Sequence, residues 1–184
     1  MSEEIQEADR LRKDVVAYGK DCADEEKYFA HVVHVLEKHR LVLLKGRVPT
    51  LVLGGKRIQK RVREHFVRLL SDFKEYPGVS IREMHLDLHL SNCKKSRVLA
   101  GLEAENYAKV ASLLSARIKK LRGLTPFVSL KPVEIVRLRE FVFRLALQHD
   151  SVAKQFGLKF KEIAGVHTKV AGEFRRIAHL ITIR

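Results

Sequence analysis

Two apolar stripes at helical spacing, both in residues 130–184, constrain the fold of this chain more than any other feature. Within residues 132–149 and again within residues 168–183, apolar side chains recur at steps of three and four, which places them on one face of a helix. Each stripe must leave water, and the nearest apolar partner along the chain is the other helix. We therefore predict an antiparallel helical hairpin. The stripes consist of Ile135, Leu138, Val142, Leu145, Val170, Phe174, Ile177 and Ile181.

The two segments also resemble a known protein family. Leu138-Arg-Glu-Phe-Val-Phe-Arg-Leu-Ala-Leu-Gln-His149 is similar to the first helix of the bacterial-type large-subunit ribosomal protein twenty-nine family, where a Leu, a Phe, a further Leu and a closing Gln-His or Gln-Lys have similar spacing. Arg175-Arg-Ile-Ala-His-Leu-Ile-Thr-Ile183 is similar to the basic end of that family's second helix. Two features depart from the family pattern: the connection 150–167 is longer than the family's linker, and His179 stands where the family usually has Arg.

The resemblance implies a function and a location. It implies a structural constituent of the large ribosomal subunit, packed on rRNA near the exit of the polypeptide tunnel and beside a protein of the twenty-three type. By position in the family pattern, the implied RNA contacts are Arg144, Gln148, His149, Arg175 and Arg176. The length of the residues preceding the hairpin suggests a mitochondrial ribosome in the matrix, with a cytoplasmic ribosome as the alternative.

The charge of the chain points in the same direction without any resemblance. Lys and Arg number 36 against 22 Asp and Glu, a formal net charge of +14. Such an excess is self-repulsive unless a polyanion neutralises it, and nucleic acid is the commonest polyanion. An acidic membrane surface is the second candidate, but no run approaches the roughly 18 apolar residues of a membrane span. Residues 1–26 instead carry a net charge of −5, and we expect them to face solvent or a basic protein.

Four basic clusters on separate predicted elements are the candidate RNA contacts. Arg suits phosphate because its planar fork donates two hydrogen bonds together, whereas Lys acts as a point charge. The chain has no aromatic platform on which single-stranded bases could stack, so we expect binding to the backbone and shape of folded RNA. With the residues that the resemblance implies, the candidates are Lys56, Arg57, Lys60, Arg61, Lys94, Lys95, Lys119, Lys120, Arg137, Arg144, Gln148, His149, Lys169, Arg175 and Arg176.

The rest of the chain is predicted to be mostly helical. We expect helices at 3–20, 24–45, 56–73 and 96–121, with Asp24 as an N-cap, a turn at 76–78 and an extended linker at 124–130. From Met84 to Leu90 the apolar period changes to two, which predicts a half-buried strand. The predicted class is therefore mainly α, built of helical hairpins with at most a small strand element. The predicted domains are an acidic segment 1–23, a helical extension 24–123 and the hairpin 124–184.

Nucleotide and catalytic sites find little support in the sequence. Gly54-Gly55-Lys56 precedes a predicted helix, but Thr50 and Arg57 stand where a phosphate-binding loop needs Gly and a hydroxyl. A helix N-terminus that meets an RNA phosphate is the better interpretation of this turn. No nucleophile has a placed base, so we predict that the protein is not an enzyme, has no small-molecule substrate and needs no cofactor.

The nine histidines and two cysteines raise the question of a metal. His85, His89 and Cys93 could bind one, but the predicted strand supplies no local fourth ligand. We therefore predict no metal site and expect partly buried or RNA-facing histidines. Cys22 and Cys93 lie far apart and outside any Cys-x-x-Cys pair, which favours a reducing compartment. Residues 1–26 are too acidic to resemble a transit peptide.

Two functions from different classes remain at this stage. The first is the structural, rRNA-binding protein described above. The second is a helical protein–protein scaffold or assembly factor of a ribonucleoprotein complex, whose hairpins bind acidic partner helices. Binding through several phosphates should be steeply salt-dependent, and this property distinguishes the two.

Overall fold

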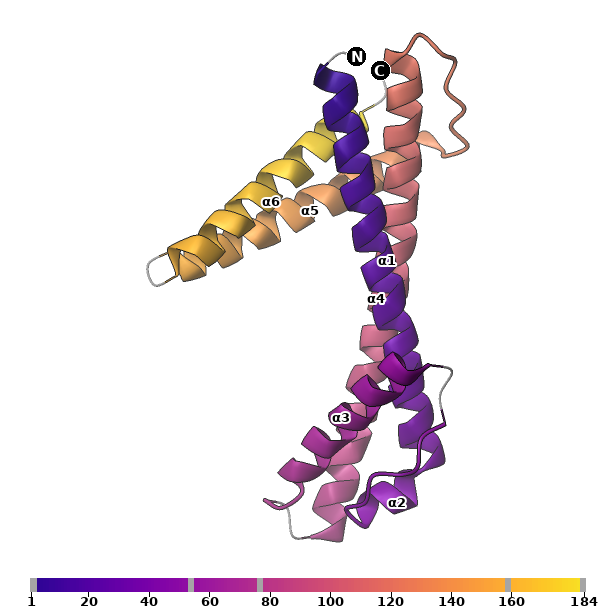
Figure 1. Ribbon diagram of the computed structural model, residues 1–184, viewed down its shortest axis with the longest axis vertical. Coiled ribbons are helices and arrows are strands. Elements are labelled where there is room, and N and C mark those ends of the chain that lie inside the picture. The colour runs from indigo at the N-terminus through magenta and orange to yellow at the C-terminus, as the bar shows by residue number, and fades with distance from the viewer. Residues whose placement is uncertain (1–2, 53–54, 76–77, 158–159, 183–184) are drawn as a thin grey trace. The chain divides into compact units, whose positions relative to one another are not determined.

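The computed structural model describes residues 3–52, 55–75, 78–157 and 160–182, and the regular secondary structure of these ranges is helical throughout (Figure 1). The mainly α class is confirmed. Positive-φ glycines, Gly46 (φ 71°) and Gly123 (φ 74°), follow α2 and α4, where a left-handed residue ends a helix readily. The helices are α1 (Glu3–Lys38), α2 (Arg40–Leu44), α3 (Lys56–Asp72), α4 (Val79–Leu121), α5 (Pro132–Phe156) and α6 (Lys161–Leu180).

The helices form two compact units. The first unit comprises Met1–Lys20 with Ala104–Arg184, and the second comprises Asp21–Glu103. Helices α1 and α4 each contribute residues to both units. The units thus interleave along the chain, whereas the segments 1–23, 24–123 and 124–184 predicted from the sequence are consecutive.

The first unit contains the predicted C-terminal hairpin. Helices α5 and α6 pack against each other along their length, which confirms the prediction from the apolar stripes. Pro132 begins α5 at a position where its missing N–H leaves no bond unmade, and the Lys131 backbone N–H donates to Glu134 at 2.9 Å. Both helices are longer than predicted, because the expected connection 150–167 is largely helical and only residues 157–160 separate them.

An aromatic cluster joins α1, α4 and the hairpin inside the first unit. The Tyr18 ring lies 5.9 Å from the Tyr107 ring and 5.8 Å from the Phe174 ring, and Tyr107 lies edge-on to Phe141 at 5.4 Å. Gly19 permits this close packing, since a Cβ at that position would lie only 3.1 Å from the Cβ of Tyr107. The unit therefore has a well-packed core of its own.

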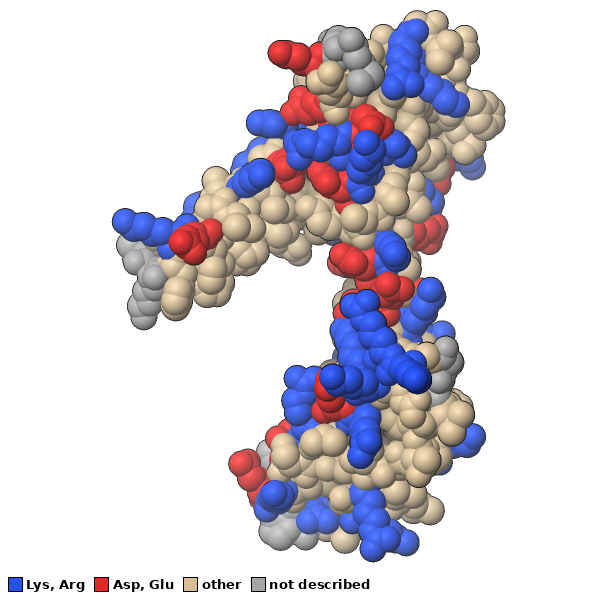
Figure 2. Space-filling view, viewed as in Figure 1, with Lys and Arg blue, Asp and Glu red and all other residues tan. Residues whose placement is uncertain are grey.

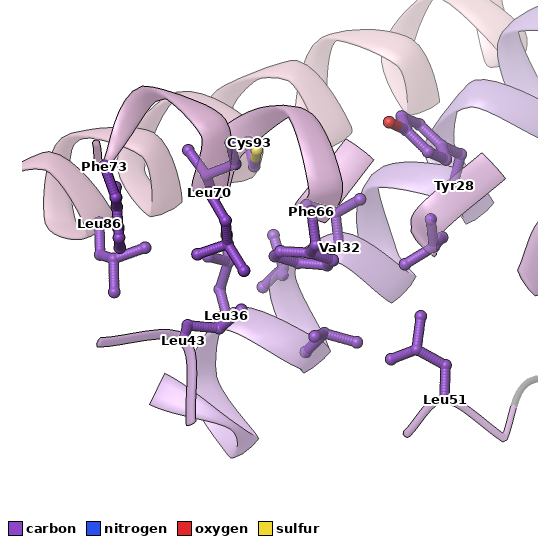
Figure 3. Packing of buried hydrophobic residues seen from close by; sticks show 14 residues of the cluster. Tyr28, Val32, Leu36, Leu43, Leu51, Phe66, Leu70, Phe73, Leu86 and Cys93 are labelled. Atoms are coloured by element: carbon purple, nitrogen blue, oxygen red, sulfur yellow. The ribbon is translucent and has the colours of Figure 1, made fainter. Parts of the chain in front are cut away.

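The second unit is built around the apolar stripe of α3. Val62, Phe66, Leu69 and Phe73 are buried, as predicted for a helix over 56–73. Figure 3 shows Phe66 and Leu70 projecting from α3 toward the side of the core that carries Leu36 and Leu43. Because this stripe is buried, the opposite face of α3 is left to solvent.

Two predictions for α1 and α4 are wrong. Residues 21–24 are helical, so α1 is continuous from Glu3 to Lys38 and Asp24 is not an N-cap. Residues 84–90 belong to α4 and form no strand. Leu86 is buried and Leu90 partly buried, whereas Met84 and Leu88 are exposed, so the alternating pattern is spread around a helix. The predicted helix 96–121 is the second half of α4, and of the predicted turn 76–78 only Gly78 is described.

Replacing Phe66 by Ala should destabilise the second unit by about 3–5 kcal/mol, because a fully buried aromatic side chain would leave a cavity. Urea unfolding followed by far-ultraviolet circular dichroism measures the change. The control is Val67→Ala on the same helix, where the side chain is 53% exposed and the effect should stay within about 0.5 kcal/mol. Equal effects of the two substitutions would contradict the packing described here.

Candidate nucleic-acid interface

Among the described helices, α3 has the densest positive charge, and its cations lie on its exposed face. Its 17 residues include six Lys or Arg and two Asp or Glu. The apolar stripe fixes the helix against the core, so the cations are directed outward, and Figure 2 shows Lys and Arg gathered over this helix. We call this surface the α3 basic face, and it consists of Lys56, Arg57, Lys60, Arg61, Arg63 and Arg68.

The N-terminal end of α3 adds to the positive potential. Its first turn contains Lys56 and Arg57 and no acidic residue, and the N-cap Gly55 has no side chain that could accept a backbone N–H. Cations at the positive end of a helix dipole are each unfavourable by a few tenths of a kcal/mol. An anion bound there would offset this unfavourable interaction and accept hydrogen bonds from the exposed N–H groups. Gly54 of the predicted turn lies outside the described residues.

Ion pairs within the chain occupy part of the basic face. Arg61 pairs with Glu25 and its guanidinium lies 4.0 Å from the centre of the Tyr28 ring. Lys60 lies 3.9 Å from Glu64, one turn along the same helix. By contrast, Lys56, Arg57, Arg63 and Arg68 form no ion pair with any residue that the structure describes. These four side chains keep their full charge available to a ligand.

The cations predicted on α4 differ in the same way. Lys94 forms an ion pair with Glu37 of α1, with the Nζ to Oε1 distance at 2.7 Å. Lys95 and Lys119 are exposed and have no such pair within the described ranges, and Lys120 is also exposed. The predicted candidates on α4 are therefore accessible, but Lys94 is already neutralised by a neighbouring helix.

The hairpin presents fewer available cations than the resemblance implies. Arg175 pairs with Asp150 of α5, and Arg176 pairs with Glu7 of α1 at 2.8 Å. The predicted contacts Arg137, Arg144 and Lys169 are exposed without an ion pair to a described residue, and Gln148 is exposed as well. The RNA contacts predicted for the hairpin therefore fall mainly on α5.

Acidic residues in the first turns of α1 form ion pairs with basic residues of the same unit. Besides the Glu7–Arg176 pair, Glu4 lies 2.8 Å from Arg117 and Arg10 lies 2.8 Å from Glu173. We expected these acids to face solvent or a basic protein; the Glu4 and Glu7 side chains remain 48% and 40% exposed while they pair with Arg117 and Arg176. The pairing neutralises charge locally, so the net positive surface lies away from the first turns of α1.

His149 has a different environment from the one that the resemblance implies. It is half-buried, its Nδ1 lies 2.8 Å from Nδ1 of His167, and its ring lies 5.7 Å from the Phe174 ring. Burial, and then the neighbouring His167, holds the pKa of His149 below its ordinary value, while Asp150 opposes the shift. A neutral imidazole packed between two helices is a structural contact and a poor phosphate ligand.

One group of side chains that the sequence interpretation did not assemble is the cluster of His65, His89 and Cys93. Helix α4 places His89 and Cys93 one turn apart on one face, and α3 brings His65 opposite them. The ligand atoms of the three residues all lie within 4.8 Å of one another. His85, which we had grouped with His89 and Cys93, packs its ring against Phe73 instead. The i, i+4 spacing of His89 and Cys93 was the available signal, and the strand prediction concealed it.

The comparisons with known proteins give no further guide. No protein-family model, no curated protein and no solved structure matches this chain. Within the described residues, no helix combines the length and apolar character needed to cross a membrane. The candidate interface thus rests on the side chains alone.

The hairpin should lose stability as the pH falls below about 6.5, the ordinary pKa of histidine. Because the folded-state pKa of His149 is depressed, the unfolded chain binds a proton that the folded chain does not. The stability is fully present above the unfolded pKa and is lost as the pH falls toward the folded pKa. Urea unfolding at several pH values between about 5 and 8 measures this dependence.

Burial also depresses the pKa values of His65 and His89, so the comparison uses variants. His149→Asn should flatten part of the pH dependence, and the matched control, His179→Asn at an exposed position of α6, should leave it unchanged. If both variants follow the wild-type curve, His149 does not contribute to the pH dependence.

Proposed function

We propose that this protein is a non-enzymatic, structural component of a ribonucleoprotein that binds folded RNA through exposed cationic helix faces. The observation that carries the proposal is the α3 basic face, where Lys56, Arg57, Arg63 and Arg68 have no acidic partner among the described residues. A face of this kind is self-repulsive in isolation, and RNA phosphates would remove the repulsion. The formal net charge of +14 supports the same ligand class.

The mechanism of binding would be neutralisation of phosphates by a rigid surface. Phe66 and its buried neighbours hold α3 in place, so the cations bind without first ordering a flexible segment. Each phosphate contact releases condensed counterions, which makes the affinity fall with salt. Because these side chains contact phosphate and not base edges, the protein would read the shape of the RNA with little sequence preference.

The resemblance of the hairpin specifies the proposal further. It suggests the large ribosomal subunit, with rRNA and a neighbouring protein of the twenty-three type as partners, in a mitochondrial or a cytoplasmic ribosome. The α5–α6 packing is compatible with that family's two-helix hairpin. The pairing of Arg175 and Arg176 with Asp150 and Glu7 is not what the resemblance implies. In this proposal, RNA contacts of the hairpin come from Arg137 and Arg144 on α5.

A second function, a protein–protein scaffold, is favoured by one observation. Helix α5 exposes apolar side chains on the face that does not pack on α6: Val133, Val136, Phe143 and Leu147 are 53%, 56%, 40% and 64% exposed. They recur at steps of three, seven and four along the helix. Clustered exposed apolar residues often mark a contact with another protein. A ribonucleoprotein component can have both kinds of contact, so salt dependence decides which is primary.

The triple variant Lys56→Gln, Arg57→Gln, Arg63→Gln should weaken binding to an RNA duplex and flatten its salt dependence. For three lost phosphate contacts, the slope of log K against log salt should decrease in magnitude by about 0.9 per contact. Fluorescence anisotropy between about 50 and 200 mM salt measures both quantities. The wild-type affinity should fall by orders of magnitude over that range.

The control variant removes the same charge elsewhere. Lys13, Arg40 and Lys109 are already paired with Asp9, Asp87 and Glu105, so changing all three to Gln should alter the slope by less than about one contact. If the control weakens binding as much as the α3 variant, net charge alone explains the binding. A wild-type affinity that falls less than threefold would favour the scaffold.

The ribosomal form of the proposal has its own test. Epitope-tagged protein should co-sediment with large ribosomal particles on a sucrose gradient and dissociate in high salt together with other peripheral RNA-binding proteins. Tagged protein that stays at the top of the gradient, while the purified protein still binds RNA, would reject the ribosome and retain the RNA-binding proposal.

A further inference from the structure

The His65, His89 and Cys93 cluster lies within the second unit and takes no part in the proposed RNA binding. Nε2 of His65 lies 2.8 Å from Nε2 of His89, and Sγ of Cys93 lies 3.6 Å from the same nitrogen. Cys93 is only 3% exposed and belongs to the apolar core, while the two histidines are half-buried at its edge. Two imidazole nitrogens and one sulfur therefore lie within 4.8 Å of one another.

Hydrogen bonding among these atoms leaves at least one of them unsatisfied. The Tyr28 hydroxyl lies 2.7 Å from Nδ1 of His65. If His65 carries its proton on Nδ1 and donates to Tyr28, His89 must donate to the bare Nε2 of His65, and then His89 cannot accept from Cys93. If Tyr28 donates instead, His65 and Cys93 compete for the one lone pair of His89 Nε2. A single cation between the three atoms would satisfy all of them.

We propose that His65, His89 and Cys93 bind a Zn²⁺-class transition-metal ion that links α3 to α4. The donor set is two imidazoles and a thiolate, which Zn²⁺ binds well. Mg²⁺ and Ca²⁺ prefer oxygen ligands, so this set does not suit them. Three protein ligands occupy three of the four coordination positions of a tetrahedral ion. The half-buried histidines leave the fourth position to a water molecule or an exchangeable ligand.

The distances agree with such an ion after a small adjustment. Tetrahedral Zn²⁺, with metal–nitrogen bonds of about 2.0–2.1 Å and metal–sulfur bonds of about 2.3 Å, places ligand nitrogens roughly 3.3 Å apart and a nitrogen and a sulfur roughly 3.6 Å apart. The sulfur of Cys93 already has that separation from His89 Nε2. The two nitrogens would separate by about half an ångström, which a small rotation of the exposed edge of either ring provides.

The surroundings of the cluster prepare the two histidines for coordination. The Tyr28 hydroxyl holds the far nitrogen of His65 and so orients its ring, a role that hydrogen-bond partners of metal-binding histidines commonly have. Burial, and then the neighbouring His89, lowers the pKa of His65 to about 4, and burial also lowers the pKa of His89. Both rings therefore offer a lone pair near pH 7, whereas burial raises the pKa of the Cys93 thiol to about 11, so an ion that binds the sulfur must displace that proton.

The test is metal titration of the full chain in a reducing, chelator-free buffer, with Co²⁺ as a spectroscopic probe and Zn²⁺ as competitor. We expect one equivalent of Co²⁺ to bind, with the near-ultraviolet thiolate charge-transfer band and the intense visible bands of a four-coordinate ion, and Zn²⁺ to displace it. Cys93→Ser should abolish the charge-transfer band and weaken binding by more than about 100-fold. Zn²⁺ should raise the melting temperature of the wild type and not that of the Cys93→Ser variant.

Matched controls keep the result interpretable. Cys22→Ser changes the only other cysteine, whose thiol lies near Glu103 and away from the cluster, and His34→Gln changes an exposed histidine of α1; both should bind like the wild type. His65→Gln repeats the test on α3 if Cys93→Ser loses helicity by circular dichroism. Absence of saturable one-to-one binding, or equal binding by the Cys93→Ser and Cys22→Ser variants, would overturn the proposal.

Discussion

Burial of the α3 apolar stripe is the interaction on which both candidate sites of the second unit depend. Once Val62, Phe66 and Leu69 enter the core, the helix can no longer rotate about its axis. That single constraint turns the α3 basic face outward, because the cations occupy the remaining positions of the helix. It also turns His65 toward α4. The same hydrophobic free energy therefore orients the α3 basic face and one member of the His65, His89 and Cys93 cluster.

The sequence predicted well those elements whose apolar pattern has a single period. The hairpin and α3 were found because their stripes are narrow and their opposite faces charged. Residues 84–90 misled the interpretation, because α4 has apolar side chains on more than one face: Leu86 enters the core while Met84 and Leu88 remain exposed. An alternating pattern results, although no proline interrupts 79–121 to end a helix. The length of the segment 79–121 and its lack of proline were better evidence for a helix than the two-residue apolar period was for a strand.

Contacts between residues far apart in the chain could not be predicted in the same way. Glu7 and Arg176 are 169 positions apart, and His65 and His89 are 24 apart, so no local spacing connects them. The strand prediction also implied the wrong distance between His89 and Cys93. Four residues of strand span about 13 Å, too far for one ion, whereas four residues of helix rise about 6 Å and return to the same face. The cluster is therefore predictable only when residues 84–93 are assigned to a helix.

Tyr28 contacts both candidate sites of the second unit. Its ring faces the Arg61 guanidinium, while its hydroxyl bonds His65. The α3 basic face and the histidine cluster thus both contact Tyr28. Replacing Tyr28 by Phe would remove the hydrogen bond to His65 and keep the ring that Arg61 contacts. If the two proposed ligands, RNA and a metal ion, both bind, any effect of one on the binding free energy of the other must be equalled in the reverse direction, and Tyr28 is the residue that contacts both sites.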